Sequence, residues 1–93
     1  MVILKNWSVC QRGNEWMAPE LWTNYLHGNV YGHPRFEDGD PVSTSSIVDI
    51  KDGDGYKIVS TRNTDYVLRE SEVDPEYESQ YPGAYKRLSM THR

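Results

Sequence analysis

The chain has 93 residues and 37% hydrophobic residues, which fits one small domain and excludes two independently folded ones. Aromatic residues make up 12% of the chain, whereas a disordered chain would contain few of them, so the composition predicts a folded protein. The net charge of −4 argues against nonspecific binding of DNA or RNA, which requires a basic surface.

The first half of the chain predicts two strands and a long loop. Residues 2–11 are rich in β-branched side chains and predict the first strand. Residues 21–31 alternate large and polar side chains, which predicts the second strand, and Gly28 within it indicates a bulge or a close backbone approach. Residues 32–41 contain two glycines and two prolines and predict a ten-residue loop.

The second half predicts three more strands separated by tight turns: strands 42–51, 56–61 and 65–69, with turns at 52–55 and 62–64. Alternation within 42–51 places Val48 and Ile50 on one face. Short strands with frequent turns predict a mainly β fold, namely a small barrel-like or strongly bent antiparallel sheet of about five strands with a short C-terminal helical tail.

The tail begins at about residue 74. Asp74 is a good N-cap and Pro75 fits the first helical position. A helical stripe of large side chains follows, formed by Tyr77, Tyr81, Tyr85 and Leu88. Pro82 and Gly83 interrupt it, which predicts two short helical pieces. We therefore expect a single domain over residues 1–88 and a frayed C-terminus over 89–93.

The cysteine content and the N-terminus predict a cytoplasmic protein. The single cysteine, Cys10, excludes an internal disulfide, on which small secreted domains usually depend. The N-terminal run turns polar at Lys5 and lacks the pattern of a signal peptide. No apolar stretch is long enough to span a membrane.

The sequence offers oxygen and nitrogen ligands but no known metal motif. Three aspartates lie around the 52–55 turn, namely Asp49, Asp52 and Asp54. Their spacing is not that of an EF-hand, and a tight hairpin explains them equally well. The three histidines, which are His27, His33 and His92, have no carboxylate at a metal-binding spacing. We expect no metal and no cofactor.

Catalytic patterns are also missing from the sequence. The hydroxyl-rich run 43–46 has no Gly-x-Ser-x-Gly elbow, and no histidine pairs with Cys10 by pattern. A chain this short has little room for a supported enzyme cavity. We expect no enzymatic activity, and a small nucleotide hydrolase remains an alternative.

A combination of arginine, aromatic and hydroxyl side chains predicts a binding site for a small anionic, nucleotide-like ligand. Arginine offers paired donors to phosphate or carboxylate, an aromatic ring can stack on a base, and hydroxyls with loop amides can complete an anion site. The predicted ligand-binding residues are His33, Arg35, Phe36, Thr44, Ser45, Arg62 and Asn63. The alternative is that Arg35 and Arg62 are solvated surface residues that balance nearby acids.

A second function class is an acidic protein–protein inhibitor that mimics nucleic acid, because the negative charge is concentrated in residues 37–93. Gathering of acidic side chains on one face would favour the mimic: Asp49, Asp52, Asp54, Glu70 and Glu72. Convergence of Arg35 and Arg62 in a cleft would favour ligand binding.

The small size of the chain predicts a homodimer or higher homo-oligomer, because one thin core without a disulfide is weakly stable. Exposed tryptophan and tyrosine suit such an interface, and the predicted interface residues are Trp16, Tyr77, Tyr81 and Tyr85. The alternative is that the tail folds back on its own barrel.

Residues 26–39, 44–48, 59–61 and 66–68 carry the pattern Gly-His-Pro-Arg-Phe, Asp-Gly, Thr-Ser and Tyr-x-Leu. This pattern resembles a family of small uncharacterised bacterial and phage proteins, and the similarity covers most of residues 20–88. The resemblance implies a phage or mobile-element protein with an anti-defence role in the host bacterium's cytoplasm, acting on a host defence factor or as a sponge for its nucleotide signal. It implies no catalytic residue.

Overall fold

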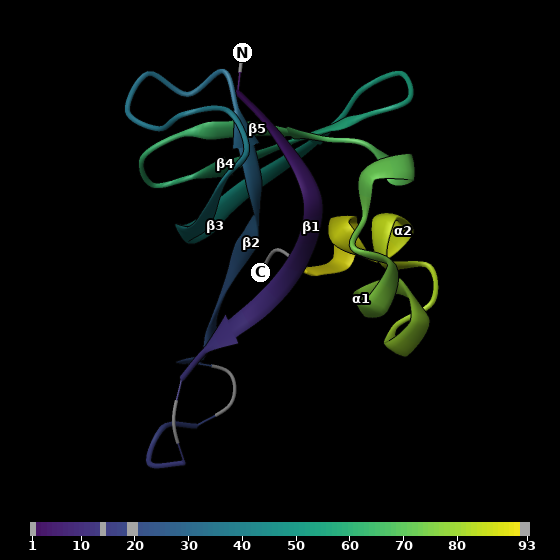
Figure 1. The fold of residues 1–93 in the computed structure, drawn as a ribbon. Helices are drawn as coiled ribbons and strands as arrows, with labels where there is room; N and C mark the ends of the chain where they lie inside the picture. Colours follow the sequence, from purple (N-terminus) through teal and green to yellow (C-terminus); the bar gives the residue numbers. More distant parts are fainter. Residues whose placement is uncertain (1, 14, 19–20, 92–93) are drawn as a thin grey trace.

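The computed structural model describes residues 2–13, 15–18 and 21–91. Five strands form a closed barrel in chain order: β1 (Val2–Arg12), β2 (Thr23–Tyr31), β3 (Asp40–Asp52), β4 (Lys57–Thr61) and β5 (Asp65–Leu68) (Figure 1). A short 3-10 helix, η2 (Glu70–Glu72), and two helices, α1 (Pro75–Gln80) and α2 (Ala84–Thr91), follow the last strand. The predicted fold class, a small β-barrel with a helical tail, is confirmed.

The barrel closes between its first and last strands. Each consecutive pair of strands is antiparallel, so the fifth strand runs in the same direction as the first. β1 and β5 therefore pair in parallel, through Val2 with Tyr66 and Ile3 with Val67. Closure satisfies backbone groups that would otherwise form two open sheet edges.

A bulge in β1 bends the strand around Gly28. Lys5 pairs with Asn29 and Ser8 pairs with His27, so two residues of β1 stand opposite Gly28 alone. A Cβ atom at Gly28 would lie 2.8 Å from the backbone oxygen of Lys5, a contact that only glycine avoids. The close backbone approach predicted at Gly28 is confirmed, and the extra residue belongs to β1.

A second bulge corrects one prediction about β3. Ile47 pairs with Thr61 and Asp49 pairs with Ser60, so Val48 is an extra residue on β3. Val48 is 46% exposed, while Ile47 and Ile50 both pack against the core. The prediction that Val48 and Ile50 share a face is wrong, because the inserted residue shifts the alternation of inward and outward side chains.

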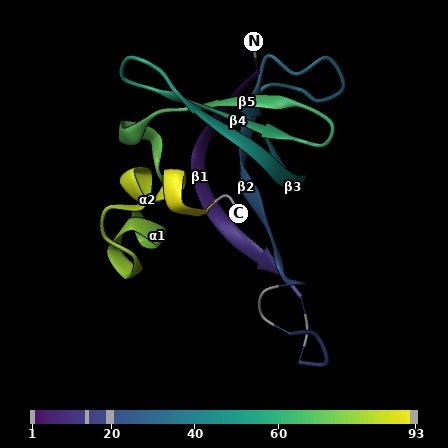
Figure 2. The same ribbon diagram turned by 180° about the vertical axis from the view of Figure 1, so that it is seen from behind.

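The core joins the barrel to the helices. Its largest fully buried side chains are Trp7, Leu4, Leu26, Leu68, Leu88, Val30 and Val59. The indole N–H of Trp7 donates to the carbonyl oxygen of Arg69 at 2.9 Å, and the backbone N–H of Asp74 donates to the carbonyl of Trp7 at 2.9 Å. These bonds fix the start of the tail against β1, and the helices cover that side of the barrel (Figures 1 and 2).

The tail forms the two predicted helical pieces. The carboxylate of Asp74 accepts from the backbone N–H of Glu76 at 3.2 Å, which confirms the predicted N-cap. The Glu78 carboxylate accepts from the backbone N–H groups of Gly83 (2.7 Å) and Ala84 (3.2 Å), and so caps the start of α2. α2 continues to Thr91, which places residues 89–91 of the predicted frayed terminus in a helix, whereas residues 92 and 93 lie outside the described residues.

The predicted boundaries of the long loop also change. β3 begins at Asp40, so Asp40 and Pro41 belong to a strand and the connection after β2 spans residues 32–39. The backbone N–H of Gly39 donates to the carbonyl of Val30 at 2.7 Å, which closes this loop at its base. Gly39 has a φ of 92°, the conformation expected of glycine at the predicted turn.

The β1–β2 hairpin extends beyond the barrel as an arm, which we define as residues 10–13, 15–18 and 21–25. β3 pairs with β2 only as far as Tyr25, so Asn24 and Thr23 pair with β1 alone. Figures 1 and 2 show this arm pointing away from the barrel and from both helices. Within the described residues, no helix has the length and apolar character needed to cross a membrane.

Candidate functional site

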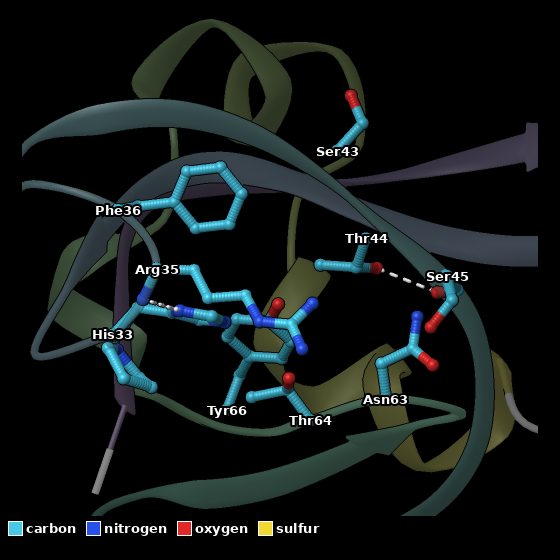
Figure 3. Close-up of a pocket in the computed structure, with 10 residues that line it drawn as sticks. His33, Arg35, Phe36, Ser43, Thr44, Ser45, Asn63, Thr64 and Tyr66 are labelled. Carbon is cyan, nitrogen blue, oxygen red and sulfur yellow. Dashed lines mark hydrogen bonds between the residues drawn. The ribbon is translucent and has the colours of Figure 1, made fainter.

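The 32–39 loop and the turn between β4 and β5 lie on the side of the barrel away from the helices (Figure 1). A pocket of about 550 Å³ is lined by residues of both (Figure 3). Its walls come from the 32–39 loop, from the middle of β3, from the turn after β4 and from the start of β5. The lining residues are His33, Pro34, Arg35, Phe36, Ser43, Thr44, Ser45, Asn63, Thr64 and Tyr66.

The pocket brings together six of the seven predicted ligand-binding residues, namely His33, Arg35, Phe36, Thr44, Ser45 and Asn63. Arg62 does not line it. The Arg62 side chain is exposed, and its backbone N–H donates to the carbonyl of Ser46 at 3.2 Å. The two arginines therefore do not converge in this pocket, although Asn63, the neighbour of Arg62, lies in its wall.

Four lining residues are absent from the predicted set: Pro34, Ser43 and Thr64, which belong to the segments that predicted the site, and Tyr66, which does not. Ser43 and Thr64 are direct neighbours of predicted site residues, so taking each segment whole would have included them. Tyr66 is buried in β5 two residues after Thr64. Alternation along that strand places Thr64 and Tyr66 on the same face, which was the available signal.

The 33–36 segment is a tight turn held by its own histidine. The ring nitrogen Nδ1 of His33 accepts from the backbone N–H of Arg35 at 3.0 Å. The imidazole also meets the ring of Phe36 edge to face, with the ring centroids 4.9 Å apart and an interplanar angle of 69°. These contacts position the side chains of Arg35 and Phe36 at the rim of the pocket (Figure 3).

A third bulge explains why adjacent residues of β3 line one pocket. Tyr25 pairs with Ser46 and His27 pairs with Ser43, so Thr44 and Ser45 together oppose Leu26. In a regular strand these neighbours would point to opposite faces of the sheet. The bulge thus gives the pocket a row of three hydroxyl-bearing residues, which alternation alone does not predict.

The two hydroxyls of this bulge differ in their bonding. The Thr44 hydroxyl accepts from the backbone N–H of Leu26 at 2.9 Å and donates to the carbonyl of Ser45 at 2.8 Å, so it is used by the fold. The Ser45 hydroxyl oxygen is buried and has no hydrogen-bond partner among the described residues. A buried polar atom left without a partner is unfavourable, and a bound polar ligand could satisfy it.

Another wall of the pocket is the turn after β4, which is closed by Thr61. The Thr61 hydroxyl donates to the carbonyl of Thr64 at 2.9 Å, and it accepts from the backbone N–H of Thr64 at 3.2 Å. The backbone N–H of Thr61 also donates to the carbonyl of Thr64 at 2.9 Å. This turn holds the carboxamide of Asn63 on the side of the pocket near Ser45 (Figure 3).

The electrostatic character of the pocket depends on Arg35. Among the described residues that line the pocket, Arg35 is the one permanently charged side chain, and none is a carboxylate. The Arg35 guanidinium makes no hydrogen bond or ion pair with any residue that the structure describes. Figure 3 shows it directed into the pocket. An unpaired guanidinium beside hydroxyl and amide groups favours an anion.

The candidate metal ligands do not form a cluster. In the described ranges, no group of three or more histidine, cysteine or carboxylate residues could hold a metal ion. Asp52 forms an ion pair with the buried Lys57. The His27 ring nitrogen Nδ1 lies 3.0 Å from the Ser43 hydroxyl, and His92 lies outside the described residues.

The acidic residues proposed for nucleic-acid mimicry are partly neutralised. Glu72 lies 3.6 Å from the ammonium of Lys5 and 3.9 Å from the guanidinium of Arg69. Asp52 is the partner of Lys57. These ion pairs place basic groups among the acidic ones, which weakens a continuous negative surface.

The predicted interface residues fall into two groups. Tyr77 and Tyr85 pack against the core of their own barrel, and burial is the main cause that raises the pKa of each phenol. Trp16 is 88% exposed on the arm, and Tyr81 is 49% exposed directly after α1. The tail thus folds back on its own barrel and leaves Tyr81 at the surface, while Trp16 is exposed on the arm.

No family model matches the chain, and comparisons with curated proteins and with solved structures give no match either. The resemblance to small bacterial and phage proteins stays a prediction.

Proposed function

We propose that the protein binds a small anionic, nucleotide-like ligand in the 550 Å³ pocket and does not transform it. The observation that carries the proposal is the Arg35 guanidinium, which is directed into a pocket of hydroxyl, amide and ring side chains and has no partner among the described residues. Arginine binds phosphate through paired, charge-assisted hydrogen bonds, and these are stronger than bonds between neutral groups.

The polar wall complements this charge. The carboxamide of Asn63 offers a donor on the side toward which Arg35 is directed, and the buried Ser45 hydroxyl, which has no partner among the described residues, could donate there after a small side-chain rotation. The exposed ring of Phe36 offers aromatic surface for a base, and the buried Tyr66 lines the pocket beneath. The pocket can therefore hold a phosphate and a base at the same time, which is what a nucleotide requires.

The charge of the pocket also selects among nucleotides. Di- and triphosphates carry several charges and are usually bound with Mg²⁺, which needs carboxylate ligands, and with more than one basic side chain. The described lining has one arginine and no carboxylate. It fits a ligand with one or two negative charges, such as a cyclic nucleotide or a nucleoside monophosphate.

The same lining supports binding without catalysis. A general base must have a free acceptor near the reacting group. The His33 Nδ1 already accepts from the backbone of Arg35, and no carboxylate lies in the described wall. Sequestration of a host defence signal by a phage or mobile-element protein in the bacterial cytoplasm is the role that the sequence resemblance adds. The acidic-mimic alternative is less favoured, because Asp52 and Glu72 form ion pairs.

The test is isothermal titration of the protein with cyclic nucleotides, nucleoside monophosphates and nucleoside triphosphates. We expect binding of the first two classes, and weaker binding of Arg35→Ala by about 1.5–3 kcal/mol, or roughly ten- to hundredfold. Arg62→Ala is the matched control: it removes the same charge from the neighbouring turn without touching the lining, and it should bind as the wild type does.

Three outcomes would contradict the proposal. The wild type could fail to bind any nucleotide at high micromolar ligand, or Arg35→Ala and Arg62→Ala could bind equally well. Recovery of a chemically altered nucleotide from the denatured complex would indicate a hydrolase instead. A mass spectrum of small molecules released from protein purified out of cells would identify the ligand directly.

A further inference from the structure

The tip of the β1–β2 arm carries large exposed apolar side chains. Trp16 is 88% exposed, Leu21 is 63% exposed and Met17 is also exposed. The arm is a two-stranded ribbon beyond the barrel, and such ribbons are marginally stable in water unless a third strand or another surface covers them. Exposed apolar groups of this size on a projecting element are typical of an interaction surface.

A second pocket, which we call the arm-base pocket, lies where the arm leaves the barrel. It has a volume of about 550 Å³ and lies between the two strands of the arm and the C-terminal helices. Its lining residues are Val9, Gln11, Asn24, Tyr77, Tyr81, Ala84 and Arg87. The rings of Tyr77 and Tyr81 stand 5.1 Å apart at an interplanar angle of 41°, so they form an aromatic wall.

The arm tip and the arm-base pocket are complementary in chemistry. The tip presents the indole of Trp16 with the exposed carboxylate of Glu15 beside it in sequence. The pocket presents two tyrosine rings and one positive charge, that of Arg87. An indole against tyrosine rings and a carboxylate near a guanidinium are both favourable contacts at protein interfaces.

One chain cannot make this contact with itself. Gln11 lines the pocket, and Trp16 lies five residues farther along an arm that points away from the barrel (Figures 1 and 2). Two arms placed side by side and antiparallel would bring each tip to the base of the other arm. A two-fold axis then forms both contacts at once.

We propose that the protein forms a two-fold symmetric dimer in which the arm tip of each copy, with Trp16 at its centre, occupies the arm-base pocket of the other copy. The partner is a second copy of this chain because tip and pocket belong to the same sequence and match in ring surface and in charge. The proposed ligand-binding pocket lies on the other side of the barrel and shares no lining residue with the arm-base pocket. The dimer proposal is therefore independent of the proposed ligand.

Sedimentation equilibrium over a range of protein concentrations tests the dimer. We expect the wild type to approach twice the chain mass of 10.8 kDa. Trp16→Ala and Tyr81→Ala should each raise the dissociation constant about a hundredfold, since each change removes a central contact twice in a symmetric dimer. Val48→Ala, which truncates an exposed apolar residue elsewhere on the barrel, is the control and should dimerise normally.

Mixing the two variants distinguishes this interface from a contact between two tips. A Trp16→Ala chain keeps an intact pocket and a Tyr81→Ala chain keeps an intact tip, so the mixed dimer retains one of the two contacts. We expect the equimolar mixture to dimerise about tenfold more tightly than either variant alone. Circular dichroism checks that both variants are folded. A monomeric wild type at the highest soluble concentration, dimerisation unaffected by Trp16→Ala, or a mixture no tighter than its components would overturn the proposal.

Discussion

The two sides of the barrel differ in polarity and in how far their polar groups are hydrogen-bonded. The side covered by the helices is apolar and closed: Trp7 and Leu88 are fully buried there, and the indole N–H of Trp7 has a backbone partner. The pocket side is polar and open, with an unpaired Arg35 and an unsatisfied hydroxyl at Ser45. The indole N–H on the first side has a partner within the fold, whereas Arg35 and Ser45 on the second side have none among the described residues.

This difference separates stability from binding within a very small domain. Burial of apolar side chains and satisfied hydrogen bonds stabilise the fold, so the helix-covered side should determine the free energy of unfolding. Polar groups without partners contribute little to stability and can contribute to affinity once a ligand supplies their partners. Substitutions on the two sides should therefore change different measurements.

The largest effect is expected from Trp7→Ala on the helix-covered side. The change removes a fully buried indole and its hydrogen bond to Arg69, and large-to-small core changes of this kind lower stability by about 3–5 kcal/mol. A domain this small has a total stability of about 5–15 kcal/mol, so the variant should lose a large part of it and unfold at a much lower urea concentration. Urea denaturation measures the loss. The comparison is Phe36→Ala on the pocket side. A similar loss of stability in both variants would contradict the proposal that the helix-covered side determines the free energy of unfolding.

An intermediate effect is expected at alkaline pH, again on the helix-covered side. Burial raises the pKa of Tyr77 above its ordinary value of 10.0, and the neighbouring Tyr81 and Cys10 raise it further. Because the folded-state pKa is the higher one, the contribution of Tyr77 to stability is complete below pH 10.0 and is lost as the pH rises through the raised pKa. Denaturation measured from pH 8 to pH 11 should show this decline. Tyr77→Phe should show a shallower decline above pH 10, and an equal slope in both proteins would contradict the assignment.

The smallest effect on stability is expected from Ser45→Ala in the pocket. The variant removes a buried hydroxyl that has no partner among the described residues, so the free energy of unfolding should stay within about 1 kcal/mol of the wild type or rise slightly. Nucleotide affinity should fall in the same variant if the ligand bonds this hydroxyl. Thr44→Ala sharpens the comparison, because it leaves the backbone N–H of Leu26 without its acceptor and should lower stability. If the Ser45→Ala protein were less stable than the Thr44→Ala protein, the assignment of Thr44 to stability and of Ser45 to binding would be wrong.

Local patterns in the sequence predicted the elements of the fold well. The glycine-rich turns, the Asp74–Pro75 helix start and the break at Pro82 and Gly83 depend on residues close together in the chain. The structure has the helix start and the break where they are predicted, and it has both glycine-rich turns, although β3 takes Asp40, Pro41 and Asp52 from their predicted ends. The face that a residue occupies was less predictable. Val48 is exposed because an extra residue interrupts the alternation, and nothing within the strand itself marks that insertion.

The pocket was predictable in its loop and its hydroxyl run but not in its boundaries. Arg35 and Phe36 lie in a loop whose composition already indicated a binding segment, and the structure places them beside Thr44 and Ser45. Arg62 was grouped with them because it also offers a guanidinium in a turn. Its neighbour Asn63 lines the pocket instead, since the orientation of each residue in that turn depends on the hydrogen bonds of Thr61. The arm-base pocket combines strand and tail residues far apart in the chain, so no local pattern could reveal it.

The parallel pairing of β1 with β5 has a consequence for where the barrel opens locally. Among the described residues this seam holds two residue pairs, which join positions 64 residues apart in sequence, so its local opening should require less free energy than that of the longer ladders. Tyr66 belongs both to the seam and to the wall of the ligand pocket. We expect opening of the seam to widen this pocket while the barrel stays intact along its other four ladders.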